Sequence, residues 1–141
     1  MDYAIKLALK SSKLNEVPVG CVITDAKGKV VGYGYNSSIK HNDPTSHAEI
    51  MAIRMACKKQ KSHKLKNHSL YVTLEPCKMC EAAIHHTGIK KVYFGAYSQS
   101  AKIFENKKKK FHKEVNGYLF HGGINEIECN KLIKNFFKKL R

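Results

Sequence analysis

The chain has 141 residues, 43% of them apolar, which is the size and composition of one ordinary globular domain over residues 1–141. No apolar run approaches the length of a membrane span and the N-terminus does not resemble a secretory signal, so we expect a cytoplasmic protein without a membrane partner. The formal net charge of +15 favours a polyanionic partner such as nucleic acid, although solvated lysines in a lysine-rich protein would give the same total.

The first third of the chain predicts a helix and a hairpin. Apolar residues among lysines favour a helix over residues 2–14. The β-rich segment Val19–Thr24, a turn at Asp25–Gly28 and a second β-rich segment at Val30–Tyr33 then predict two paired strands.

Two helices alternate with two strands in the middle of the chain. A polar loop from Asn36 to Thr45 leads to a predicted helix from His47 to about Lys59. Leu70–Leu74 and Val92–Ala96 are predicted strands. Between them, proline at the first helical position predicts a helix from Pro76 to about His86.

The last third is harder to interpret. Within residues 97–123, Ile103-Phe104 could begin a short element, and Tyr118–Phe120 could be a strand or a loop. An apolar stripe at helical spacing predicts a final helix from Asn125 to Arg141. This order of elements is typical of an α/β domain in which helices cover both faces of a mixed sheet.

Two short motifs can hold a metal ion: His47-Ala48-Glu49, and Pro76-Cys77-Lys78-Met79-Cys80 thirty positions later. Cysteines three apart share one face of a helix, and in its first turn the helix dipole favours their thiolates. Two thiolates and the His47 imidazole give zinc three protein ligands. A fourth position is left for water, which is typical of a catalytic zinc site.

Glu49 is the candidate proton carrier. Inside a helix, residues two apart point to different sides, but at the first turn both can reach one cavity. We therefore predict that the helix begins at or just before His47. Glu49 would take a proton from the attacking water and deliver it to the base and then to the departing amine.

Two other interpretations of the cysteine pair stay open at this point. A redox pair would leave the histidine and glutamate motif unexplained. A structural zinc site would need a fourth protein ligand. Four histidines are available for that ligand: His63, His68, His85 and His86. The remaining cysteines are predicted to be small buried residues: Cys21, Cys57 and Cys129.

The pattern H-x-E…P-C-x-x-C is the known motif of zinc-dependent nucleobase deaminases. The chain resembles the bacterial-type tRNA-specific adenosine deaminases of the cytidine deaminase-like superfamily, well over residues 1–96 and reasonably over 124–141. The matching segments are Glu16–Gly20, Asn42–Ile50, Leu70–Cys80 and Phe136–Arg141.

The resemblance implies a three-layer α/β/α fold with a five-stranded mixed sheet, bound zinc and a homodimer. It also implies conversion of the wobble adenosine to inosine in the tRNA anticodon loop. Asn36 would then hydrogen-bond the flipped base, the Ala48 amide and the Pro76 carbonyl would help to orient it, and Val17 would pack against it. An ordinary turn residue at a strand end is an equally good interpretation of Asn36.

Some positions depart from this family. Gly88 stands where the tRNA enzymes usually carry arginine, Tyr97–Lys102 replaces the usual loop, and Phe111–Lys113 only partly matches the expected motif. Two alternatives therefore stay open. One is a deaminase of a free base or nucleoside, such as cytosine or guanine. The other is a nucleic-acid-binding module with a structural zinc, which would not need Glu49.

Overall fold

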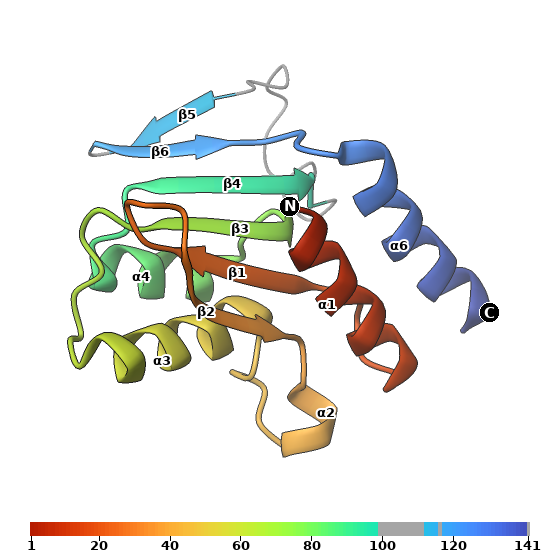
Figure 1. Cartoon of the computed structure of the whole chain (residues 1–141). Helices are drawn as coiled ribbons and strands as arrows, with labels where there is room; N and C mark the ends of the chain where they lie inside the picture. The colour runs from red at the N-terminus through yellow and green to blue at the C-terminus, as the bar shows by residue number, and fades with distance from the viewer. Residues whose placement is uncertain (99–111, 116, 141) are drawn as a thin grey trace.

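The computed structural model describes residues 1–98, 112–115 and 117–140 (Figure 1). In chain order the elements are α1 (Asp2–Lys13), β1 (Gly20–Thr24), β2 (Val30–Tyr35), α2 (Ser38–His41), α3 (Ala48–Gln60), β3 (Ser69–Leu74), α4 (Lys78–Thr87), β4 (Lys91–Ala96), β5 (His112–Val115), β6 (Tyr118–His121) and α6 (Glu126–Lys139). None of the helices in these ranges combines the length and apolarity that a membrane crossing requires.

The strands form one mixed sheet in the order β2-β1-β3-β4-β6-β5. β3, β4 and β6 run parallel, and the other pairs are antiparallel. The predicted α/β class is confirmed, but the described sheet has six strands rather than five. The additional strand, β5, pairs with β6 at the sheet edge, and its sequence His-Lys-Glu-Val carries too little apolar alternation to be recognised.

Helices cover both faces of the sheet, as predicted (Figure 1). Side chains of β1 point alternately to the two faces because the side-chain period of a strand is two. Cys21 and Ile23 join the main core with buried alanines of α3, whereas Val22 packs against Ala4 and Leu7 of α1. α6 lies on the α1 side of the sheet and contacts β4.

Several predicted boundaries change. α3 begins at Ala48, so His47 is its N-cap rather than its first residue. α4 begins at Lys78, so the placement of Pro76 at the first helical position is wrong. The loop before α3 contains the short helix α2. Tyr118–Phe120 lies in a strand, and Ile103-Phe104 lies outside the described residues.

A glycine contact fixes the start of α3 against the sheet. A Cβ atom added to Gly34 of β2 would lie 2.5 Å from the Ala48 carbonyl oxygen and 2.6 Å from the Met51 Cβ. Only a residue without a side chain permits this approach. The position of the His47 N-cap therefore depends on a glycine two elements away.

We predict that Gly34→Ala destabilises the fold by about 3 kcal/mol or more, the upper end of the cost of overpacking, since backbone must move to admit the methyl group. Urea unfolding would measure the loss. Gly28→Ala is the matched control: Gly28 has a φ of 81° but no atom near the added Cβ, so it should lose only about 1–2 kcal/mol. Equal losses in the two variants would contradict the packing argument.

Candidate active site

The two metal-binding motifs both lie at helix N-termini. His47 caps α3 and Cys77 caps α4, each with extended backbone angles, and neither side chain caps its own helix. Their carbonyl groups accept the first helical bonds, from Met51 and Glu81. The side chains are thus available for a ligand, and the positive ends of two helix dipoles favour thiolates there.

The three predicted ligands converge. The Sγ atoms of Cys77 and Cys80 each lie 3.6 Å from Nδ1 of His47, and all three donor atoms lie within 4.8 Å of one another. Tetrahedral zinc with bonds of about 2.3 Å to sulfur and about 2.0–2.1 Å to nitrogen would separate its S and N ligands by about 3.6 Å. The donor set therefore fits zinc.

No fourth protein ligand joins this cluster among the described side chains. His63, His68, His85 and His86 are not part of it, so the structural-site interpretation, which needs four ligands, finds no support in the described part of the chain. The site instead has the three-ligand arrangement of catalytic zinc.

Burial makes this site unfavourable for negative charge without a cation. Burial raises the pKa of the Cys80 thiol well above its usual range, and the charges of Glu49 and Cys77 raise it further. Burial also raises the pKa of the Glu49 carboxyl, to about 7, although hydrogen bonds from its own backbone and from Cys80 act in the opposite direction. A divalent cation would stabilise these groups in their charged forms.

Glu49 lies beside the cluster as predicted. Its side chain is 4% exposed and hydrogen-bonds Cys80, because the helix start at Ala48 leaves Glu49 in the first turn. A buried carboxylate beside a metal-binding cluster can take up and release a proton.

The residues expected to contact a base lie around this centre. Ala48 is fully buried at the start of α3, and Pro76 is buried directly before Cys77. Asn36 follows β2, and its neighbour Ser37 donates its backbone N–H to the Ser46 carbonyl at 3.0 Å, which holds Asn36 next to the α3 N-cap.

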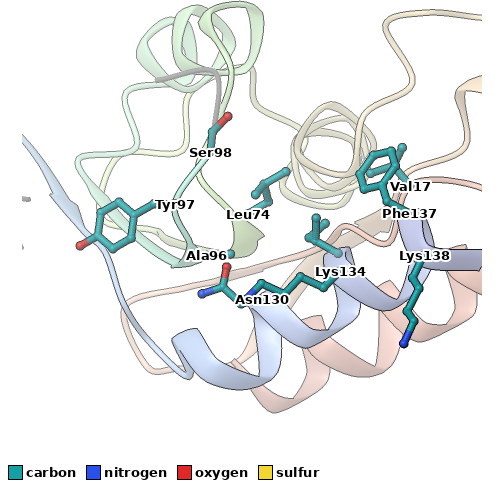
Figure 2. Close-up of a pocket in the computed structure, with 10 residues that line it drawn as sticks. Val17, Leu74, Ala96, Tyr97, Ser98, Asn130, Lys134, Phe137 and Lys138 are labelled. Carbon is teal, nitrogen blue, oxygen red and sulfur yellow. The ribbon is translucent and has the colours of Figure 1, made fainter. Parts of the chain in front are cut away.

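Val17 instead lines a cavity of about 530 Å³ between the ends of β3 and β4 and α6 (Figure 2). Its walls include Leu74, Ala96, Lys134 and Phe137, and none of the three metal ligands. The sequence did not predict this cavity, because its walls come from four separate segments and have no common spacing.

Gly88 has a structural explanation. It caps the C-terminus of α4 with a φ of 79°, in the left-handed region that favours glycine. Its presence is therefore accounted for by the helix end and does not by itself indicate a free-base substrate. Of the other departures, Tyr97 and Ser98 are described, and Phe111 lies outside the described residues.

An α/β/α fold with a three-ligand zinc set and a buried glutamate at the helix start defines a zinc-dependent hydrolase of the deaminase class. The family model described as "Cytidine and deoxycytidylate deaminase zinc-binding region" matches residues 1–96, and the chain belongs to this family of enzymes.

Similar proteins include both tRNA and free-base enzymes. A tRNA-specific adenosine deaminase from Haemophilus influenzae is 41% identical over 100% of this chain and 83% of its own length. A structure from a study of A-to-I editing by tRNA:A34 deaminases is 41% identical, with a TM-score of 0.69 over 71% of this chain and 76% of that one. Guanine deaminase from Bacillus subtilis is 36% identical, with a TM-score of 0.67 over 73% and 66% of the two chains.

Replacement of a ligand should remove the metal. We predict that Cys80→Ala lowers zinc from about one atom per chain to a small fraction of that, because two protein ligands hold zinc poorly. Metal analysis of dialysed protein would measure this. Cys57→Ala, which changes a cysteine of α3 outside the cluster, should retain zinc. Retention of zinc by Cys80→Ala would remove Cys80 from the ligand set.

Glu49→Gln should separate metal binding from catalysis. We expect zinc to stay bound while kcat falls about 10²–10⁴-fold, since an amide cannot carry the proton. Glu81→Gln, on α4 and paired with Lys78, serves as the control and should keep its activity. If Glu49→Gln lost zinc as well, the carboxylate would act as a ligand rather than as a proton carrier.

Proposed function

We propose that this enzyme converts adenosine to inosine at the wobble position of tRNA, in the anticodon loop. The observation that carries the proposal is the identity with tRNA-specific adenosine deaminases along the whole chain, including the α6 segment that lies beyond the zinc-binding region. The buried Glu49 next to three converging zinc ligands supplies the chemistry.

Each site residue has a distinct task in this proposal. When bound by His47, Cys77 and Cys80, zinc acidifies a water molecule and so supplies the nucleophile. Glu49 would transfer both protons of the attacking water in turn, the first to the ring nitrogen and the second, from the hydroxyl group of the addition product, to the departing amine, so that adenosine and water give inosine and ammonia.

Orientation of the base falls to residues around the metal ligands. Asn36 hydrogen-bonds the base, the backbone amide of Ala48 and carbonyl of Pro76 hold its edge, and Val17 packs against it. A loop base is already partly unstacked, so its entry into the site costs little.

α6 supports the choice of RNA as the substrate. Lys134, Phe137 and Lys138 line the cavity next to Val17, so cationic and aromatic side chains lie together beside a solvent-accessible hollow (Figure 2). Lysines contact phosphates and aromatic rings stack on unpaired bases in RNA recognition.

Another basic cluster lies elsewhere in the chain and consists of Lys58, Lys59, Lys61, Lys64 and Lys66. It begins in the last turn of the thirteen-residue helix α3, about 15–20 Å along the helix axis from His47. The basic residues of α6 line the cavity beside Val17, which favours them over this cluster for contacts with an RNA loop.

Guanine deamination is the second candidate, favoured by the 36% identity with the Bacillus subtilis enzyme.

We further propose that residues 1–141 form one domain, that the enzyme acts as a homodimer and that it works in the cytoplasm.

The deciding experiment incubates zinc-loaded protein with an anticodon stem-loop, adenosine, guanine and cytosine, and measures ammonia release. We expect turnover of the stem-loop with inosine at the wobble position, and at least about 100-fold lower kcat/KM for free adenosine, because remote RNA contacts contribute to transition-state binding. The Glu49→Gln protein is the control for contaminating activity. Turnover of guanine alone would replace the tRNA proposal with the second candidate.

A further inference from the structure

A buried carboxylate that hydrogen-bonds Asn36 has no task in the function proposed above. Glu16 lies between α1 and β1 and is 1% exposed. No described lysine, arginine or histidine forms an ion pair with it. Burial of a carboxylate without a cation is costly unless hydrogen bonds satisfy both oxygens.

Two N–H groups satisfy these oxygens. Oε1 accepts the backbone N–H of Lys40 at 2.8 Å, and Oε2 accepts Nδ2 of Asn36 at 3.3 Å. A carboxylate can only accept, so the nitrogen end of the Asn36 amide must face it and the oxygen end must point away. Glu16 thereby selects one of the two orientations of a nearly symmetrical side chain.

Asn36 is restrained from every other side as well. Its backbone N–H bonds the Val19 carbonyl at 3.0 Å, and its carbonyl accepts the hydroxyl of the fully buried Ser11 at 3.0 Å. Its Oδ1 accepts the Ser38 hydroxyl at 3.4 Å. The amide keeps one N–H and one lone pair unused, in fixed directions.

The backbone next to the restrained amide is tied to the start of α3. The bond from Ser37 to Ser46 joins the chain after β2 to the residue before His47, and Gly34 lies directly against Ala48. A donor and an acceptor in set positions discriminate between base edges, because each base has its own order of donors and acceptors.

We propose that Glu16 is a positioning residue, whose carboxylate orients the Asn36 amide so that its free N–H and lone pair match the substrate base. The inference rests on the proposed function, in which Asn36 contacts the base. In this proposal a residue of the α1–β1 connection contributes to substrate specificity at a centre whose metal ligands come from α3 and α4.

Glu16→Gln tests the orientation. If the backbone N–H of Lys40 still donates to the amide oxygen of the introduced glutamine, the NH₂ group of that glutamine faces Nδ2 of Asn36. Two donors then face each other, and the Asn36 amide must rotate or move away. We expect kcat/KM for the stem-loop to fall about tenfold or more, with unchanged zinc content. The control is Asp25→Asn in the β1–β2 turn. Oδ1 of Asp25 accepts two backbone N–H groups, so this substitution also removes one negative charge from a hydrogen-bonded carboxylate. It should keep full activity.

A double-mutant cycle separates positioning from a merely structural effect. In an Asn36→Ala background, Glu16→Gln should cause no further loss of kcat/KM, because its target is gone. The same fold-loss in both backgrounds would overturn the proposal, as would full activity of Glu16→Gln in the parent enzyme. If Glu16→Gln fails to fold, the same cycle with Glu16→Asp, which retains both acceptor oxygens on a shorter arm, decides the matter.

The cycle also distinguishes this inference from the proposed function. If the parent enzyme turns over only a free base, the tRNA substrate is wrong, and the cycle is run on that base. If Asn36→Ala keeps full activity, Asn36 does not contact the base and the positioning role fails with it, while the zinc chemistry stands. Loss in Asn36→Ala with none in Glu16→Gln overturns the positioning role alone.

Discussion

The convergence of two helix N-termini on one point is the constraint on which this site depends. His47 and Cys77 occupy N-cap positions, where serine, threonine, asparagine or aspartate would stabilise each helix by about 1 kcal/mol. Neither side chain caps its helix, so both helices give up this stabilisation. In return, two ligands are held by rigid backbone rather than by loops. Cys80 then needs only the regular geometry of the first turn of α4 to complete the set.

The same arrangement buries two ionisable groups, the Glu49 carboxyl and the Cys80 thiol, away from solvent. The Glu49 carboxyl and the Cys80 thiol share a hydrogen bond, and burial raises the pKa of each. Without a cation, charged groups at this centre would lower the stability of the fold. With a cation, the same groups form a preorganised binding site. Sites that break local rules of stability in this way are where function is expected to lie. The fold compensates elsewhere, through close packing of α3 on β2 at Gly34.

Much of this centre could be predicted from the sequence because its residues are close in the chain. The spacings of His47 with Glu49 and of Cys77 with Cys80 are local, and local spacing fixes direction at a helix start. The start itself was misplaced by one residue, since an N-cap has extended angles that residue type does not reveal. Glu16 could not be identified, because its burial and its contact with Asn36 arise only when two distant segments meet.

The site is built from two separate parts of the chain. α3 and α4 supply the metal ligands and Glu49, whereas the connection between α1 and β1 supplies Glu16, and Val17 of the same connection packs against the core that contains the α3 alanines. They meet around the start of β1 and the end of β2, where Gly20 pairs with Tyr35 immediately before Asn36. Glu16 therefore acts on this region through Asn36 from the α1–β1 connection, whereas the metal ligands come from the starts of α3 and α4. In the proposed mechanism a change at Glu16 or Asn36 thus alters which base is accepted while the zinc cluster stays intact, because the substrate is set by the site and not by the fold.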